Sequence, residues 1–188
     1  MLLAVDIGNT NISFGIFKGM GLKKTFDIPT KQYSRDKLFK KITSLKSADT
    51  LISSVVPGIT RVAAKDLAAI TGKRPYIIGK EIKVPIKNLY RRPDQVGQDR
   101  LVNAYAAVKL YGAPLIVVDF GTAVTFDVIS KSGSYEGGLI LPGLGLSIDA
   151  LNRGTALLPE IKIGRPKELI GRDTASSMLS GIVYGFAA

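Results

Sequence analysis

Two short polar segments of the sequence, each at the end of an apolar run, carry residues suited to holding a phosphate group. The first run ends in Asp6-Ile7-Gly8-Asn9-Thr10, and the second ends in Asp119-Phe120-Gly121-Thr122. A glycine lets backbone N–H groups approach an anion closely, and asparagine and threonine add short side-chain donors. The aspartate can hold a cation against that anion. Taken alone, each segment also suits an ordinary hairpin turn.

The two segments belong to a longer internal repeat. With one deletion, residues 115–128 align with residues 2–16 as two strand-turn-strand units. The matched polar residues are Asp6 with Asp119, Gly8 with Gly121, and Thr10 with Thr122. Two such turns facing each other would hold a polyphosphate from both sides. The repetition therefore favours a duplicated phosphate-binding unit over two unrelated hairpins.

A third group of charged residues, Asp99 and Arg100, follows Gly97 at the predicted start of a helix that runs to about Tyr111. The planar guanidinium of arginine suits a substrate carboxylate. An aspartate in this place can accept a proton from a nearby hydroxyl. Alternatively, Asp99 only interacts favourably with the helix dipole, and Arg100 is a solvated charge. The local sequence supports both interpretations.

The elements that must position these residues follow from hydrophobic periodicity. In the first repeat, the apolar run from Leu2 predicts a buried strand, and alternation over residues 11–17 predicts a second. Residues 22–28 can supply a third antiparallel strand. The later predicted elements are a helix from Ser34 through Leu45, a strand over 50–56, a helix after Pro57-Gly58 and a strand over 74–79. This order predicts an α/β fold with mixed sheets flanked by helices.

The second repeat begins with the strand at Leu115, and its third strand is predicted over residues 135–143. A helix over 144–152 and a last helix after Gly171-Arg172-Asp173-Thr174 follow. The predicted domains are residues 1–113 and 114–188. Because the second is shorter and ends on a helix without a polar cap, we expect its later strands and helices to be absent.

Three hydroxyl side chains next to these elements have two interpretations each. Ser53 and Ser54, near the end of the strand over 50–56, either contact a ligand or form hydrogen bonds with nearby backbone groups. Thr174 caps the last helix or faces a ligand. The sequence does not choose between these interpretations.

Composition narrows the chemistry that the chain can perform. The 188 residues are 46% hydrophobic, which is enough for a substantial core, and they include neither Cys nor His. Acid-base chemistry must therefore use Asp, Glu, Lys or Tyr, and metal sites must use oxygen ligands, which suit Mg²⁺ or a monovalent cation. The formal charge of +11 is scattered, which favours small anionic substrates over nucleic acid. With neither a signal-peptide pattern nor a membrane-length apolar span, we expect a cytoplasmic protein.

Five segments in order resemble the motifs of type III pantothenate kinases, a family within the superfamily of acetate and sugar kinases, heat-shock chaperones and actin. They are Asp6-Ile7-Gly8-Asn9-Thr10, Ser53-Ser54-Val55-Val56-Pro57, Gly97-Gln98-Asp99-Arg100, Asp119-Phe120-Gly121-Thr122 and Gly171-Arg172-Asp173-Thr174. The resemblance implies two ribonuclease-H-like domains, as in actin-like ATPases. It also implies ATP-dependent phosphorylation of the primary hydroxyl of pantothenate, the first step toward coenzyme A.

The resemblance also implies roles for particular residues. The phosphate loop would comprise Asp6, Ile7, Gly8, Asn9, Thr10, Asn11, Ile12 and Ser13, with Asp6 near Mg²⁺. In the other domain, Thr122 would contact ATP, and Asp119 would belong to a site for a monovalent cation, K⁺ or NH₄⁺. The pantothenate pocket would include Tyr90, Gly97, Gln98, Asp99, Arg100 and Thr174, with Asp99 as the general base. Members of the family form homodimers.

Three departures from the family pattern qualify these implications. Gln98 stands where a small residue, often alanine, is usual, and Arg91-Arg92 makes its loop more basic. Family members also continue with a Gly-rich segment that holds the adenine side of ATP, so we expect weak ATP binding and slow or no turnover. A non-catalytic regulatory paralogue, of the transcriptional accessory type, is an alternative on the same fold. A phosphate-binding ATPase is another, but it would leave Tyr90 and Arg100 without a role.

Overall fold

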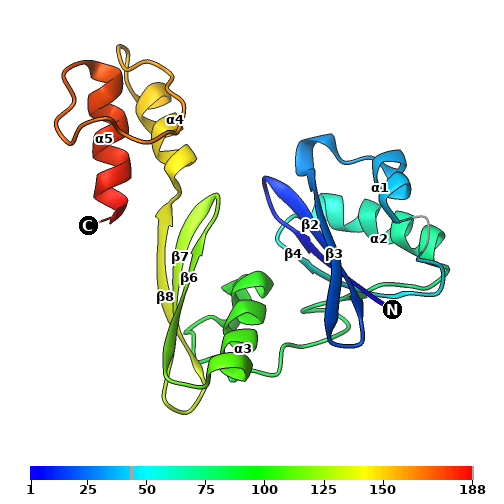
Figure 1. The fold of residues 1–188 in the computed structure, drawn as a ribbon. Coiled ribbons are helices and arrows are strands. Elements are labelled where there is room, and N and C mark those ends of the chain that lie inside the picture. The colour runs from blue at the N-terminus through cyan, green and yellow to red at the C-terminus, as the bar shows by residue number, and fades with distance from the viewer. Residues whose placement is uncertain (43–44, 188) are drawn as a thin grey trace. The chain divides into compact units, whose positions relative to one another are not determined.

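The computed structural model describes residues 1–42 and 45–187, and the chain divides into two compact units (Figure 1). The first unit consists of residues 1–115 and 128–137, and the second consists of residues 116–127 and 138–188. The sequence predicted a domain boundary between residues 113 and 114. The division into compact units does not test that boundary, which stays a prediction.

The first unit is built on a five-stranded sheet with the strand order β3-β2-β1-β4-β5. Its strands are β1 (Leu2–Ile7), β2 (Asn11–Lys18), β3 (Gly21–Pro29), β4 (Asp49–Ser54) and β5 (Tyr76–Ile77). β2 pairs antiparallel with both β1 and β3, whereas β4 pairs parallel with β1 and with β5. The sheet is therefore mixed, with β1 at its centre.

One face of this sheet forms the core of the first unit. Buried and exposed residues alternate along β1 and β2, because successive side chains of a strand point to opposite faces. Phe14 and Phe26 stack with their ring centroids 4.6 Å apart. Other members of this core are Leu3, Val5, Ile7, Ile12, Leu38, Ile42, Ile52, Ala63 and Leu67. The polar residues between them, such as Asp6 and Ser13, lie on the opposite face.

Helices α1 (Arg35–Ile42) and α2 (Pro57–Thr71) contribute their apolar side chains to this core and pack against each other. The backbone N–H of Lys37 donates to Ser34 Oγ at 3.3 Å, as predicted for a helix cap. α2 begins at Pro57 and ends at Gly72, whose φ of 74° suits glycine. The other described helices of the first unit are η1 (Thr30–Gln32), η2 (Pro93–Gln95) and α3 (Gln98–Tyr111). Of these, α3 contacts β4.

The second unit takes most of its residues from β6 (Leu115–Phe120), β7 (Ala123–Ile129), β8 (Tyr135–Pro142), α4 (Leu144–Gly154) and α5 (Thr174–Ala187). The strands form a three-stranded sheet in the order β6-β7-β8, and α4 packs against α5. Residues 128–137, where β7 passes into β8, cluster with the first unit.

The predicted α/β fold, with a mixed sheet flanked by helices, is confirmed, although two details differ. The strand predicted over 74–79 is reduced to Tyr76–Ile77, because Gly79 adopts a φ of 85° that ends the extended backbone. Val62, which helical spacing places on one face of α2 with Ile59, Leu67 and Ile70, is 51% exposed. Part of the helix predicted through Leu45 falls on residues 43 and 44, which lie outside the described residues.

Candidate active site

The turn between β1 and β2 has the geometry of a tight hairpin. The backbone N–H of Gly8 donates to the carbonyl oxygen of Asn11 at 2.9 Å. A Cβ on Gly8 would lie 3.1 Å from the same oxygen, so a larger residue would crowd the turn. Asp6 and Ser13 are paired across the two strands and are both exposed. The turn and these two side chains can therefore be reached by a ligand from one side of the sheet.

The predicted phosphate loop contains two kinds of residue. Ile7 and Ile12 are completely buried in the core, so they can offer a ligand only backbone groups. Polar residues that are exposed to solvent are Asp6, Asn9, Thr10, Asn11 and Ser13. The loop thus consists of an apolar anchor on one face and polar groups on the other.

The structure distinguishes the two serines at the end of β4. Ser54 Oγ accepts hydrogen bonds from the N–H of Val56 at 3.0 Å and from the hydroxyl of Thr60 at 2.6 Å, so it satisfies local groups. Ser53 is 7% exposed, and its Oγ has no hydrogen-bond partner among the described residues. Ser53 is paired with Asp6 across the parallel strands, so their side chains share a face of the sheet. Of the two hydroxyls, only that of Ser53 remains a candidate for ligand contact.

The start of α3 is fitted to the carboxylate of Asp99. Its Oδ1 accepts a hydrogen bond from the backbone N–H of Arg100 at 2.9 Å and occupies the space where a Cβ on Gly97 would be. Gly97 therefore leaves room for the carboxylate. A Cβ there would also lie 3.7 Å from Val55 Cγ1, and the N–H of Val55 donates to the carbonyl of Ile7 at 3.1 Å. Through Val55, the start of α3 lies next to the end of β1.

Gln98, the unusual residue of this motif, packs against Gly79. A Cβ on Gly79 would lie 2.7 Å from the side-chain Cδ of Gln98, and the φ of 85° at Gly79 also favours glycine. The amide of Gln98 thus covers the backbone after β5. Sequence reasoning did not foresee this contact, because it joins a loop to a helix start.

Tyr90 and Arg100 meet on the ring of Tyr135. Tyr135 is fully buried, its ring centroid lies 6.4 Å from that of Tyr90, and Arg100 Cζ lies 5.9 Å from the centroid of Tyr135. Tyr135 is held in place because its N–H donates to Lys87 O at 2.8 Å and its carbonyl accepts from Leu89 N–H at 2.9 Å. Arg100 is half-buried, so it is not the freely solvated charge of the alternative interpretation.

Tyr135 is a residue that the sequence analysis missed. It supports two predicted pocket residues, yet its backbone partners, Lys87 and Leu89, lie far from it in the sequence. The available signal was a single aromatic residue before the Gly137-Gly138 pair. A Cβ on Gly137 would lie 3.5 Å from the Tyr90 ring, so Gly137 also belongs to this cluster.

The turn of the second unit resembles the first but is one residue shorter. The N–H of Gly121 donates to the carbonyl of Ala123 at 3.0 Å, and the N–H of Gly143 donates to the carbonyl of Thr122 at 2.9 Å. A Cβ on Gly143 would lie 2.6 Å from Thr122 O, so this position needs glycine. Asp119 and Thr122 are exposed beside this turn. These polar residues were predicted from the repeat, whereas the contact with Gly143 was not.

Thr174 does not cap α5, because Asp173 does. The carboxylate of Asp173 accepts hydrogen bonds from the backbone N–H of Ser176 at 2.8 Å and from its hydroxyl at 2.7 Å. These bonds lower the pKa of Asp173 below its ordinary value. Thr174 is the exposed first residue of the helix. Its hydroxyl is therefore not needed for capping.

The predicted site residues fall into both units. Asp6 to Ser13, Tyr90 and Gly97 to Arg100 lie in the first unit, whereas Asp119, Thr122 and Thr174 lie in the second. Within the described residues there is no group of three or more Asp and Glu side chains that could hold a metal ion. A single carboxylate such as Asp6, next to a phosphate-sized turn, fits Mg²⁺ that is shared with substrate phosphates.

Solved structures of similar fold define the class of this protein. The chain aligns over its full length with 80% of a protein from Sinorhizobium meliloti assigned as a 2-dehydro-3-deoxygalactonokinase, at a TM-score of 0.56 and 13% identity. It also aligns over 98% of its length with 75% of a Baf family protein from Campylobacter jejuni, at a TM-score of 0.55 and 20% identity. At these identities the similarity shows the fold alone, which is the ribonuclease-H-like fold.

Sequence comparison identifies the family within this fold to which the chain belongs. A sequence model of the type III pantothenate kinase family matches residues 2–188. The chain is 41% identical to the type III pantothenate kinase of Moorella thermoacetica and 43% identical to that of Persephonella marina. Each alignment covers 99% of this chain and 77% of the relative. The chain belongs to the type III pantothenate kinase family, a family of phosphotransferases.

These comparisons confirm the predicted family, and they do not favour the regulatory paralogue. Separately, no helix among residues 1–42 and 45–187 is long and apolar enough to cross a membrane.

Proposed function

We propose that this chain transfers the γ-phosphoryl group of ATP to the primary hydroxyl of pantothenate, producing 4'-phosphopantothenate in the first step of coenzyme A biosynthesis. The geometric observation that carries the proposal is the contact chain from Ile7 through Val55 to Gly97. It brings a turn suited to phosphate next to a helix start that carries a carboxylate and a guanidinium. Membership of the family supplies the two substrates.

The turn from Asp6 to Ser13 binds the phosphates of ATP. Its exposed polar side chains and backbone N–H groups supply donors, and the buried Ile7 and Ile12 fix the loop to the core. Asp6 would hold Mg²⁺, which offsets the negative charge of the phosphates when it is bound. The family resemblance adds Thr122 to the residues that bind ATP.

Asp99 orients the pantothenate hydroxyl and accepts its proton. Phosphoryl transfer demands mainly alignment and charge stabilisation, so the proton leaves late in the reaction. The hydrogen bond from the N–H of Arg100 to Oδ1 fixes the orientation of the carboxylate. Because a carboxylate accepts hydrogen bonds through both oxygens, this bond leaves capacity for the substrate.

Arg100 and Tyr90 recognise pantothenate. The guanidinium of Arg100 can pair with the substrate carboxylate through two parallel hydrogen bonds, and its packing over Tyr135 restricts its orientation. The pocket also includes Gly97, Gln98 and Thr174. For Gly97 and Gln98, the contacts with Asp99 and Gly79 indicate an indirect contribution through the shape of the site.

The finer features of the proposal follow from the family resemblance. Asp119 belongs to a site for K⁺ or NH₄⁺, the protein acts as a homodimer, and it works in the cytoplasm. The exposed carboxylate of Asp119 beside the second turn supplies an oxygen ligand that a cation can reach.

Detection of the product by mass spectrometry tests the proposal. The purified chain is incubated with MgATP and pantothenate, in potassium, ammonium or sodium buffer. We expect slow formation of 4'-phosphopantothenate, and more of it in potassium or ammonium than in sodium. Consumption of neither substrate in any buffer, together with binding of duplex DNA, would instead support the regulatory paralogue.

A further inference from the structure

Thr30 makes two hydrogen bonds to the phosphate turn, and no role described above accounts for it. Thr30 is the first residue of η1, directly after β3, and is 7% exposed. Its hydroxyl donates to the carbonyl oxygen of Gly8 at 2.7 Å. Its backbone N–H donates to the carbonyl oxygen of Thr10 at 2.9 Å. Two carbonyl groups of the turn are thus held by one buried residue.

These bonds determine which backbone groups the turn presents to a ligand. In a trans peptide, the carbonyl and the following N–H point in opposite directions. When Thr30 holds the carbonyl of Gly8, the N–H of Asn9 is directed away from Thr30. A carbonyl oxygen that faced a phosphate would repel it, whereas an N–H attracts it. The hydroxyl of Thr30 therefore selects the peptide orientation that suits an anion.

The second unit lacks this side-chain contact. Its third strand also ends in a proline, Pro142, and the next residue, Gly143, donates its N–H to Thr122 O at the same distance of 2.9 Å. The backbone bond is therefore common to both units. Glycine has no hydroxyl, so Gly143 cannot bond to the carbonyl of Gly121 in the way that Thr30 bonds to the carbonyl of Gly8. The side-chain bond is therefore specific to Thr30.

We propose that Thr30 is a positioning residue for ATP, whose hydroxyl fixes the Gly8–Asn9 peptide in the orientation that binds the nucleotide phosphates. The proposal rests on the proposed function, because it assumes that this turn is the phosphate site. Thr30 itself lies behind the turn and does not contact the nucleotide.

The test replaces Thr30 by valine, which keeps the shape and the backbone N–H but removes the hydroxyl, and by serine, which keeps the hydroxyl. Thr71→Val is the matched control, because Thr71 is also buried and donates its hydroxyl to Leu67 O at 2.8 Å. It lies beyond the opposite end of β1, where Asp49 N–H bonds to Met1 O and Ser47 N–H bonds to Thr71 O. For the wild type and each variant, calorimetry gives the Kd of magnesium tripolyphosphate, of a non-hydrolysable ATP analogue and of pantothenate.

We expect Thr30→Val to raise the Kd of tripolyphosphate and of the ATP analogue roughly threefold to tenfold, the range for one lost hydrogen bond. The Kd of pantothenate should not change. Thr30→Ser should restore both phosphate affinities, and Thr71→Val should lower Tm without changing any Kd. In turnover assays, the Thr30→Val defect should appear in the KM for ATP and not in the KM for pantothenate.

The proposal is overturned if Thr30→Val leaves both phosphate Kd values unchanged, or if it raises the pantothenate Kd equally. It is also overturned if the wild type binds neither phosphate probe. If Thr30→Val does not fold, Thr30→Ala is measured against the same criteria. A wild type that binds the probes but forms no phosphopantothenate would contradict the proposed function, while the Thr30 comparison would still be decided.

Discussion

The two turns of this molecule share a pattern of hydrogen bonds, but they differ in length by one residue and in what surrounds them. In each, a glycine N–H closes the turn, and the residue after the third strand donates its N–H to a threonine carbonyl. The first turn is anchored by Ile7 and Ile12 in a continuous core. The second lies beside apolar residues that are largely exposed, such as Phe120 at 70%. The repeat thus determines the local geometry of a turn, whereas the surrounding packing determines how firmly it is held.

A pocket in the second unit illustrates this difference. It has a volume of about 390 Å³ between the β6-β7-β8 sheet and α5. Its apolar lining residues are Phe120, Val124, Phe126, Leu141, Ile182 and Phe186. Close packing fixes side chains, and unfilled space removes the contacts that would do so. We therefore expect a substitution in the second turn to displace its backbone more than an equivalent substitution in the first turn.

The largest expected effect concerns Asp99, the proposed general base, which lies in the first unit. Asp99→Asn should lower kcat about 10²- to 10⁴-fold, the usual range for a lost general base, while the Kd of pantothenate stays nearly constant. Steady-state kinetics and calorimetry measure the two quantities. Asp94→Asn, at an exposed position in η2, is the control and should leave both unchanged. If Asp99→Asn lowers only Tm, Asp99 merely stabilises the helix start.

Arg100→Ala should weaken pantothenate binding about 10- to 100-fold, because a charged hydrogen-bonding partner of the carboxylate is lost. The KM for ATP should change little, since the phosphate turn is intact. Arg100→Lys should recover only part of the affinity, because lysine keeps the charge but not the planar fork. Exposed Arg92 provides the control variant Arg92→Ala. Equal losses in Arg92→Ala and Arg100→Ala would indicate a general electrostatic effect.

Gly143→Ala tests the second turn directly. The added methyl group would collide with the carbonyls of Gly121 and Thr122, so we expect a loss of about 1–3 kcal/mol of stability, as for overpacking, and a raised KM for ATP. Gly145→Ala is the control, because a Cβ there meets only Ile163, at 4.0 Å. Thermal unfolding and kinetics measure the effects. A Gly143→Ala chain as stable and active as Gly145→Ala would show that the second turn is freely deformable.

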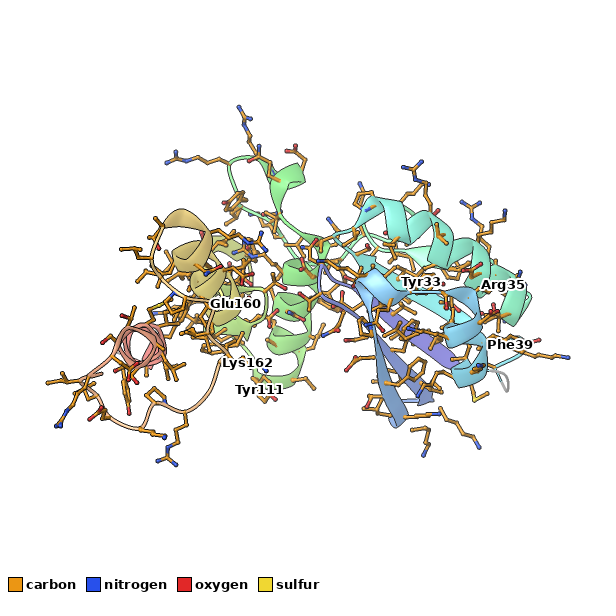
Figure 2. All side chains as sticks on the ribbon, turned by 90° about the horizontal axis from the view of Figure 1, so that it is seen from above. Tyr33, Arg35, Phe39, Tyr111, Glu160 and Lys162 are labelled. Carbon is orange, nitrogen blue, oxygen red and sulfur yellow. The ribbon has the colours of Figure 1, made fainter. Side chains whose placement is uncertain are left out.

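The smallest expected effect is a loss of stability at alkaline pH, and it arises in the first unit. Tyr33, which Figure 2 labels, donates its hydroxyl to Asp66 Oδ2 at 3.1 Å. Burial, followed by the charge of Asp66 and this hydrogen bond, raises the pKa of Tyr33 above its ordinary value. A raised pKa means that the associated stability is complete below the unfolded pKa of about 10 and is lost as pH rises further.

Thermal unfolding between pH 8 and 11 measures this dependence. The wild type should lose Tm as pH rises through 10, and Tyr33→Phe should lose less over the same interval. Tyr76→Phe, at a half-exposed tyrosine, is the control and should follow the wild type. Parallel curves for the wild type and Tyr33→Phe would show that the Tyr33–Asp66 contact does not contribute.

The sequence predicted those parts of the fold and site that depend on local pattern. Alternation of apolar residues predicted β2, because one face of that strand is buried and the other is not. The duplicated Asp and Gly residues predicted both turns, because a tight turn near an anion restricts which residues fit. Asp99 was noticed as a charged residue beside Gly97 at a predicted helix start, although the space that Gly97 leaves for its carboxylate was not.

The contacts of Thr30 and Tyr135 could not be predicted in this way. Thr30 meets Gly8 across a separation of 22 residues, and the meeting depends on the lengths of β2 and β3 and on the bulge between Ile16 and Phe17. Tyr135 pairs with Lys87 and Leu89 in a segment without hydrophobic periodicity. Hydrophobic periodicity reports which face of an element is buried, but not which distant residue meets it. The proline before both Thr30 and Gly143 was the one available sign of the shared contact.

The central claim is that phosphate passes to pantothenate and not to water. The most direct measurement is the rate of ADP release by the chain with MgATP in potassium buffer, with and without pantothenate. We predict that ADP release depends on pantothenate and matches the amount of 4'-phosphopantothenate formed, molecule for molecule. ADP release at the same rate without pantothenate would contradict the claim and identify an ATPase.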